Sequence, residues 1–508
     1  MRRGARLYAS LLALPLLTLC ASAQAEAEAE SKMIAAVKTV GELPPAPPHQ
    51  WSDLAADLND NRAAGNGLVS APALQRYLNR LYTSIKTAAG VSEWPGQVYI
   101  SSDTTLNAHA SASGNIYLHM GLIQSVESED EIYGVMAHEF AHVYLNHQAA
   151  YEAHQVTSNV AAGAKALLLG FFKKKLPGTN TSWSPFDSVA LVDSVVHESL
   201  LPVWQRDVEE QADMFAGTLM LRERYSYPAG YKVFLERLAT LEQRDVAPSP
   251  FAQNAVAGTG TGTGAGAGTG AAAAPAAGAA RKTHATARER EEVLTAKMLP
   301  LMPRPRPAPR KQEWQAVLQE QETAELLAHF ALRADIARLQ AAGRHADAVK
   351  LAQKAASGAT AGDATMLLVL QDAMSKAGTN IDEQRTVLLR NRNWPERAWS
   401  LQYQAAALVK PEQAGFAKEF LQEQYAYFGE TPRTWPDMVG FYFRNDDKMS
   451  QMALSLKCVT DARFRDACSE RARTDAQRQQ AAAQQAAREQ QQADSLQKKI
   501  NTIFKIKQ

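Results

Sequence analysis

The stretch GVMAHEFAHVYLNH, residues 134–147, decides how the rest of the chain is interpreted. It places one carboxylate and three imidazoles in an otherwise apolar run, namely His138, Glu139, His142 and His147. Burying such groups without partners is unfavourable, so something must satisfy them. Because His138 and His142 are four residues apart, a helix puts both on one face, within reach of a single ion.

This spacing indicates a zinc site. Neutral imidazole suits Zn²⁺, and two such ligands leave room for a third ligand and a water molecule. Glu139 lies about 100° around the helix from His138, which places it beside the metal-bound water. There it can take a proton from the water and later deliver one to a leaving amine. The alternative, a chance match in a core helix, leaves the buried polar groups unexplained.

A third ligand is predicted in QRDVEEQADMFAGTLM, residues 205–220. On a helix Glu209 lies about 75° from the centre of the apolar stripe, whereas Glu210 lies about 175° away. We therefore expect Glu209 to reach inward and Glu210 to be solvated. Asp213, one turn further on, can accept a hydrogen bond from the second ring nitrogen of a ligand histidine. The stripe consists of Val208, Ala212, Phe215, Ala216 and Leu219.

Length and composition describe an ordinary globular chain. It has 508 residues, 46% hydrophobic and 21% charged, with a net charge of +1. This length is enough for two or three domains, and the near-zero charge, without a basic cluster interleaved with aromatics, argues against nucleic acid as a partner.

The first 25 residues have the pattern of a signal peptide. A basic start is followed by an apolar stretch and by Ala23-Gln24-Ala25, which fits the small-x-small cleavage rule. We expect an exported, periplasmic protein, soluble or peripheral to the membrane. A lipoprotein anchored through Cys20 is less favoured, because Leu19 precedes it where a lipobox has a small residue.

Two cysteines remain after such a cleavage, Cys458 and Cys468. In an exported protein they form a plausible disulfide that closes a short loop. Two unpaired helical cysteines are the alternative.

Periodicity predicts the elements around the motif. Residues 70–89 have helical spacing, and residues 97–101 and 115–120 read as strands. A long helix is expected from Ser128, which has a glutamate three residues later as in a capping box, into the 150s. A further helix is expected over residues 204–224. Residues 157–172 are apolar but short for a membrane span, which favours a core or surface-docking helix.

The chain resembles the gluzincin zinc metallopeptidases, the family that includes HtpX and BepA. The motifs are HEFAH (138–142) and EEQAD (209–213), with Arg206 three residues before Glu209. The resemblance implies that Glu209 is the third ligand and that Arg206 stands close to the ligands. His147 matches a further histidine of the family.

A second part of the resemblance lies in THATARER, residues 283–290. BepA-like members have a Thr-His-Pro segment with an arginine six residues after the histidine, a pattern that His284 and Arg290 match, with Ala285 in place of the proline. In those relatives the histidine lies on a loop that can cover the metal as a fourth ligand. An exposed histidine on a linker is the alternative.

These features give the expected architecture. An α+β zincin-type domain, mostly helical with a small sheet, is followed by an all-α, tetratricopeptide-like repeat domain. The predicted divisions are a signal peptide (1–25), a lead-in (26–66), a metallopeptidase domain (67–298) with a flexible Gly/Ala-rich insertion (255–280), a Pro-rich linker (299–312), a repeat domain (313–450) and a helical tail (451–508).

The resemblance implies an exported zinc endopeptidase with one Zn²⁺ per chain, in which Glu139 activates the zinc-bound water. Its substrates would be extended chains of misfolded or unassembled envelope proteins, paired with an edge strand near residues 115–119. The repeat domain would hold partners such as an outer-membrane assembly machine. A zinc-containing chaperone or assembly factor with a latched or inactive site is the alternative.

Overall fold

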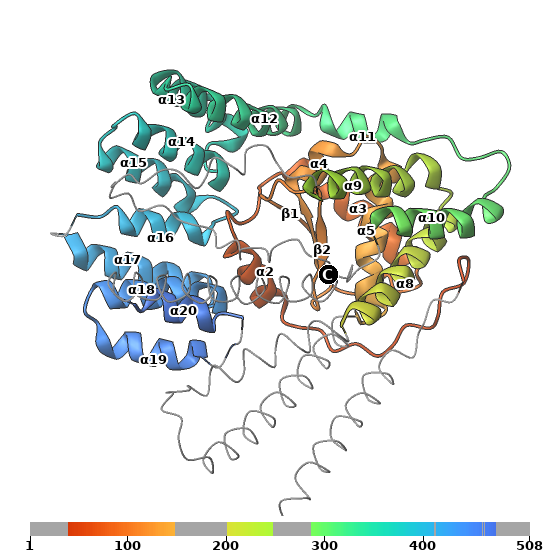
Figure 1. The fold of residues 1–508 in the computed structure, drawn as a ribbon, viewed down its shortest axis with the longest axis horizontal. Helices are drawn as coiled ribbons and strands as arrows, with labels where there is room; N and C mark the ends of the chain where they lie inside the picture. Colours follow the sequence, from red (N-terminus) through yellow and green to blue (C-terminus); the bar gives the residue numbers. More distant parts are fainter. Residues whose placement is uncertain are drawn as a thin grey trace, which may run out of the picture. The chain divides into compact units, whose positions relative to one another are not determined.

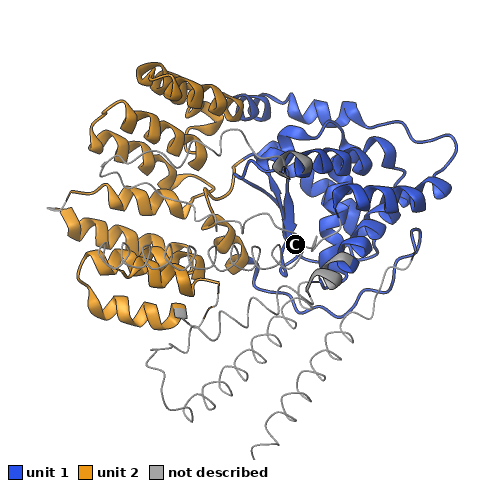
Figure 2. Ribbon diagram, viewed as in Figure 1, with its two compact units in different colours: residues 1–54, 71–328 blue, residues 55–70, 329–508 orange. Residues whose placement is uncertain are grey.

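The computed structural model describes residues 39–147, 201–246, 286–410, 413–459, 461 and 463–473. It divides into two compact units, residues 1–54 with 71–328 and residues 55–70 with 329–508 (Figure 2). The predicted signal peptide with Cys20, the apolar segment 157–172, the insertion 255–280 and most of the tail lie outside the described residues. Within the described part, we find no helix with the length and hydropathy needed to cross a membrane.

The first unit is mostly helical around a small sheet (Figure 1). The helices expected over 70–89 and 204–224 form as α3 and α8. The elements are α3 (Pro72–Ala88), β1 (Val98–Ser101), β2 (Ala108–Ala110), β3 (Ile116–His119), α4 (Met120–Ser125), α5 (Glu129–Tyr144), α8 (Leu201–Arg222), α9 (Tyr231–Val246), α10 (Ala287–Met298) and α11 (Lys311–Leu318).

The sheet corrects one prediction. Its order is β1-β3-β2, with β1 parallel and β2 antiparallel to β3. Residues 116–119 therefore form the central strand rather than an edge. The short strand β2 was missed because three residues of Ala-His-Ala carry too little alternation to predict a strand. A tight turn through Gly114, at a φ of +87°, brings β2 back alongside β3.

Helix α5 begins as predicted and ends earlier than predicted. The Ser128 hydroxyl accepts a hydrogen bond from the Glu131 amide, while the Glu131 carboxylate accepts one from the Glu127 amide. The helix ends at Tyr144, so the expected continuation into the 150s is wrong. The chain turns at Asn146, whose φ of +56° is incompatible with a continuing right-handed helix.

Glycines allow close packing around α5. A Cβ on Gly134 would lie 2.6 Å from Cβ of Tyr231, the first residue of α9. Helices α8 and α9 both pack on α5, and every residue of α5 except Glu139 and His142 is buried. The helix that carries the histidines is therefore clamped between two others.

The second unit is entirely helical in its described residues. It comprises α2 (Leu54–Arg62), α12 (Gln321–Ala341), which begins in the first unit, and then α13 (His345–Ala355), α14 (Ala364–Lys376), α15 (Ile381–Leu388), α16 (Trp399–Ala407), α17 (Ala414–Tyr427), α18 (Trp435–Arg444), α19 (Lys448–Val459) and α20 (Arg465–Arg471). Helices α13 to α20 stack side by side in Figure 1. The tetratricopeptide-like character of this stack remains a prediction.

Two ion pairs connect distant parts of this unit, and one disulfide connects two neighbouring helices. Helix α2 comes from the N-terminal side of the chain, and its Arg62 and Asp60 pair with Glu396 and Arg433 at 2.8 and 2.7 Å. Cys458 of α19 and Cys468 of α20 form a disulfide. The unit therefore joins residues 55–70 to residues 329–508, which flank segment 71–328 of the first unit in the sequence.

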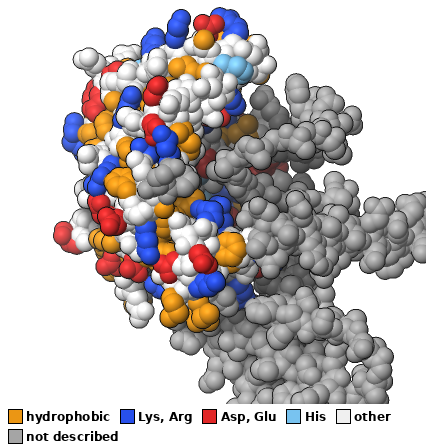
Figure 3. Space-filling view, turned by 90° about the vertical axis from the view of Figure 1, so that its left-hand side faces the viewer, with side chains coloured by type: hydrophobic (Ala, Val, Ile, Leu, Met, Phe, Trp, Pro, Cys, Tyr) orange, Lys and Arg blue, Asp and Glu red, His pale blue; other side chains and the backbone are white. Residues whose placement is uncertain are grey.

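Charges on this unit lie mostly at its surface. Figure 3 shows Lys and Arg side chains interspersed with Asp and Glu over one of its faces. Helix α19 also exposes hydrophobic side chains, with Met449, Met452 and Leu456 at 80%, 63% and 68% exposure.

Candidate metal centre

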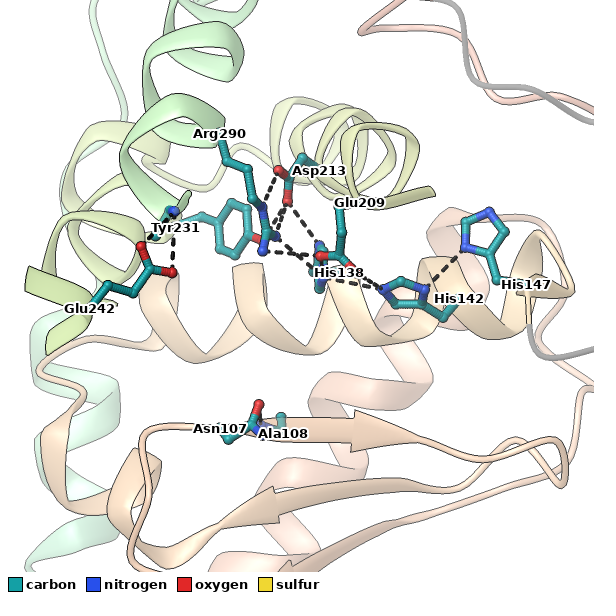
Figure 4. A network of polar contacts seen from close by, with 11 residues as sticks. Asn107, Ala108, His138, His142, His147, Glu209, Asp213, Tyr231, Glu242 and Arg290 are labelled. Carbon is teal, nitrogen blue, oxygen red and sulfur yellow. Dashed lines mark hydrogen bonds and ion pairs between the residues drawn. The ribbon is translucent and has the colours of Figure 1, made fainter. Parts of the chain in front are cut away.

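Three side chains converge between α5 and α8 (Figure 4). His138 and His142 lie one turn apart on α5, with their Nε2 atoms 3.3 Å apart. The Glu209 carboxylate of α8 approaches both, at 3.4 Å from His138 Nε2 and 3.7 Å from His142 Nε2. Glu210, the neighbouring carboxylate, points outward and pairs with Lys297. The helical-wheel argument for Glu209 over Glu210 thus agrees with the structure.

The spacing of these atoms fits a zinc ion. Zinc bonds to nitrogen and oxygen ligands are about 2.0–2.2 Å long, so a tetrahedral ion separates its ligand atoms by about 3.3–3.6 Å. One atom from each of His138, His142 and Glu209 lies within 4.8 Å of the others, and the closest approaches match the tetrahedral separation. Two imidazoles and one carboxylate leave the fourth position open.

Each ligand histidine is held through its other ring nitrogen. His138 Nδ1 lies 2.9 Å from Asp213 Oδ1, as predicted for the carboxylate one turn beyond Glu209. A proton on Nδ1 shared with that carboxylate leaves Nε2 free to bind a metal. The sequence-based reasoning on Asp213 therefore agrees with the contact.

His147 plays the equivalent part for His142. The two Nδ1 atoms are 3.1 Å apart, so one donates a hydrogen bond to the other. In a continuous helix a residue five positions on would point about 140° away. The turn at Asn146 instead brings His147 back against His142. It is buried, with 4% of its surface exposed.

Arg290 of α10 supplies the positive charge behind the ligands. Its Nε and Nη2 donate to Asp213 Oδ2 and Oδ1 at 2.9 and 2.7 Å, a two-point contact with one carboxylate. Its Nη1 lies 3.0 Å from Glu209 Oε2. The resemblance singled out Arg290 without naming its partners, and these are a ligand and the carboxylate that orients another ligand.

The start of α10 is also fixed. Thr286 and Glu289 form a capping box, and the Glu242 carboxylate of α9 accepts a hydrogen bond from the Ala287 amide at 3.1 Å (Figure 4). The chain leaves α9 at Val246 and enters α10 at Ala287. Glu242 therefore secures the element that carries Arg290 close to where the intervening segment begins.

Glu139 faces the strand β2. Burial raises the pKa of its carboxyl to about 7, and the Glu209 carboxylate adds to this, whereas His138, Arg290 and a hydrogen bond from the Ala110 amide act in the opposite direction. A bound divalent cation would lower this pKa again. A carboxyl that titrates near neutrality is suited to both accept and return a proton.

The two ligand histidines differ in basicity. Burial would lower the pKa of His138, but its contacts with Asp213 and Glu209 raise it to about 9. Burial and the charge of His138 lower the pKa of His142 to about 4. The Glu209 and Asp213 carboxyls have pKa values below their usual range, because His138 and Arg290 outweigh the effect of burial. A zinc ion would replace the proton on His138 Nε2.

Two of the predicted site residues cannot be placed among the described residues. The side chain of Arg206 and the whole of His284 fall outside the described residues. One site residue was missed: Tyr231, whose hydroxyl donates to Asp213 Oδ1 at 2.7 Å and accepts from Arg290 Nη2 at 3.1 Å. A tyrosine that starts an amphipathic helix has no pattern that marks it, so the sequence offered no signal.

Comparisons with known proteins point to the same region. The profile described as Peptidase family M48 matches residues 72–298. Metalloprotease LoiP of Escherichia coli is 30% identical over 202 residues, which are 38% of this chain and 69% of LoiP.

Three further relatives match over shorter shares of their length. The beta-barrel assembly-enhancing proteases of Yersinia pestis and Escherichia coli are 33% and 32% identical over 82 residues, 16% of this chain and 17% of theirs. The putative beta-barrel assembly-enhancing protease of Vibrio cholerae is 27% identical over 188 residues, which are 36% of each chain. The chain thus spans about a third or less of these three. With LoiP covered over two thirds of its length and the family profile enclosing both helices that carry the ligands, the chain belongs to peptidase family M48, the zinc metalloendopeptidases.

Proposed function

We propose that this chain is an exported endopeptidase with one zinc ion, which hydrolyses peptide bonds of misfolded or unassembled envelope proteins. The observation that carries the proposal is the convergence of two Nε2 atoms and the Glu209 carboxylate, with Glu139 next to His138 on the same helix. His138, His142 and Glu209 would hold the metal.

The chemistry divides between the metal and the protein. Zinc, when bound, lowers the pKa of a water molecule and polarises the scissile carbonyl group. Glu139 takes the proton from the attacking water and returns it to the leaving amine. Asp213 and His147 keep the ligand nitrogens oriented. Arg290 balances the two buried carboxylates.

The strand β2 is the better place for an extended substrate than residues 115–119. Its Ala110 amide is hydrogen-bonded to Glu139, so β2 is the strand beside the proposed base. A substrate running along β2 would present its backbone to Glu139 and to the ligand side chains. Binding through backbone groups gives modest sequence selectivity, which suits unfolded clients.

Location and partners follow from less direct observations. Residues 1–25 have the pattern of a signal peptide, which supports a periplasmic protein. Three of the relatives are named for beta-barrel assembly, which supports clients among outer-membrane proteins. The exposed hydrophobic side chains on α19 of the helical unit support binding of such a client or of an assembly partner.

The test is degradation of an unfolded substrate, casein, by the purified mature protein. Glu139→Gln is the test variant. Glu210→Gln is its matched control, because Glu210 is solvated and pairs only with Lys297 among the described residues. We expect wild type and the control to cut, with loss of 10²–10⁴-fold in rate for Glu139→Gln and full inhibition by a zinc chelator.

The opposite result would favour the alternative of a chaperone with a latched site. If wild type and Glu139→Gln both hold zinc and neither cuts, the endopeptidase assignment fails under those conditions. His284→Ala then separates the two remaining cases. Cleavage that appears in this variant indicates a latched protease, and continued inactivity indicates a chaperone that retains the metal.

A further inference from the structure

Tyr231 lies directly behind one ligand histidine. It is the first residue of α9, its side chain is fully buried, and its ring stacks at 5.8 Å on the His138 imidazole with an interplanar angle of 29°. Gly134 leaves the space for it, because a Cβ there would meet the Tyr231 side chain. Packing thus fixes where the hydroxyl group points.

The Tyr231 hydroxyl is one of several groups that contact the same atom, Asp213 Oδ1. Asp213 Oδ1 accepts from Tyr231 at 2.7 Å and from Arg290 Nη2 at 2.7 Å, and lies 2.9 Å from His138 Nδ1. The hydroxyl in turn accepts from Arg290 at 3.1 Å. Two hydrogen bonds and the nearby imidazole nitrogen thus surround one carboxylate oxygen (Figure 4).

We propose that Tyr231 is a positioning residue for the metal centre. Its hydroxyl holds Asp213 against His138 Nδ1, which keeps the His138 proton on Nδ1 and leaves Nε2 to bind zinc. The inference rests on the proposed zinc site and is independent of whether the chain cleaves peptides. Groups that orient metal-binding histidines typically change metal affinity or activity by 10–100-fold when removed.

The chain contains a matched control for the hydroxyl group. Tyr227, four residues earlier, is also fully buried, and its hydroxyl forms a 2.8 Å hydrogen bond with Thr295. Removing the Tyr227 hydroxyl costs one hydrogen bond, and removing the Tyr231 hydroxyl costs two. Both substitutions leave the ring in place. Of the two hydroxyl groups, only that of Tyr231 touches Asp213.

The experiment compares Tyr231→Phe with Tyr227→Phe in the full chain. Zinc affinity is measured by chelator competition, and the ligand geometry by the visible absorption spectrum of the Co²⁺-substituted protein. We expect Tyr231→Phe to bind zinc 10–100-fold more weakly, with an altered cobalt spectrum. Tyr227→Phe should stay within about twofold of wild type in zinc affinity, with an unchanged cobalt spectrum, although it too loses a hydrogen bond and some thermal stability.

A double-mutant cycle with Asp213→Asn tests the route of the effect. If Tyr231 acts through Asp213, adding Tyr231→Phe to Asp213→Asn changes zinc affinity by less than twofold. Additive losses, or a Tyr231→Phe protein that matches Tyr227→Phe in affinity and cobalt spectrum, would overturn the inference. Should Tyr231→Phe fail to fold alone, the comparison of Asp213→Asn with and without Tyr231→Phe still decides in the zinc-loaded protein.

The outcomes also separate this inference from the proposed function. Wild-type protein that binds zinc, responds to Tyr231→Phe and does not cut casein would retain the positioning role and remove the endopeptidase. Casein cleavage by wild-type protein, together with a zinc affinity that Tyr231→Phe does not change, would support the endopeptidase and overturn the positioning role.

Discussion

Charged side chains are mostly buried in the metal centre and mostly exposed on the helical unit. At the centre, Asp213 and Arg290 have side chains that are 3% and 14% exposed, and they satisfy one another between α8 and α10. On the helical unit, pairs such as Lys376 with Asp372 are about half exposed and lie within one helix. Exposed pairs contribute little to stability, whereas breaking a buried pair leaves a desolvated charge.

The difference shows where each region gets its structure. Helices of the second unit are specified by apolar periodicity and caps, so a change at one surface pair should remain local. Residues of the centre come from four helices, α5, α8, α9 and α10, and depend on one another. We expect mutations there to be coupled and large.

The largest effect tests that coupling directly. Arg290→Met removes the cation facing Asp213 and Glu209, and we expect a loss of about 3–5 kcal/mol in stability without zinc. Added zinc should offset part of it, because the ion supplies positive charge at the same place. Thermal unfolding in chelator and in zinc measures both. Arg288→Met, which removes an exposed pair on the same helix, is the control and should change the unfolding temperature little. Equal losses in the two variants would contradict the expected difference between buried and exposed pairs.

One buried carboxyl in the helical unit provides a second test. Asp363 caps α14, and burial raises the pKa of its carboxyl to about 6 from 3.8. The folded state binds this proton more tightly than the unfolded chain does. The contribution of protonated Asp363 to the free energy of unfolding is therefore fully present below about pH 4. It is lost as the pH rises through 6, and the loss is about 3 kcal/mol.

Asp363→Asn retains the cap and removes the charge. We expect the variant to be more stable than wild type at pH 8, with the difference vanishing near pH 4, as measured by urea unfolding at both values. A difference that is independent of pH would contradict this assignment.

The disulfide should act locally. Reduction of the bond between Cys458 and Cys468, ten residues apart, should lower the stability of the α19–α20 pair by about 2–3 kcal/mol. Hydrogen exchange with and without reductant should speed up in α19 and α20 and stay unchanged in α5. Faster exchange in α5 would show that the two regions are coupled.

The smallest effect concerns the segment between α9 and α10. Because Glu242 secures the start of α10, we expect removal of residues 255–280 to leave zinc affinity unchanged. Shortening the connection between α9 and α10 should change stability by about 1 kcal/mol or less. Chelator competition on the shortened protein checks this. A loss comparable to that of Arg290→Met would mean that the removed residues support the site.

Much of the fold near the site could be predicted from local patterns. The α3 and α8 helices, the strands at β1 and β3, and the cap at Ser128 all have periodicity or capping signals of their own. The end of α5 could not be predicted, because Asn146 adopts a left-handed conformation that asparagine permits but does not require. Strand β2 likewise exists only through pairing with β3.

The sequence by itself determined the candidate metal ligands, because helical spacing alone places His138 and His142 on one face and turns Glu209, not Glu210, inward. The sequence also predicted that Asp213 lies against the second ring nitrogen of a histidine of this set. Only the tertiary structure decided what holds that set: Arg290 and Tyr231 reach Asp213 from α10 and α9. Their contacts depend on how helices pack, and no local pattern encodes a distance between elements that are far apart in the chain.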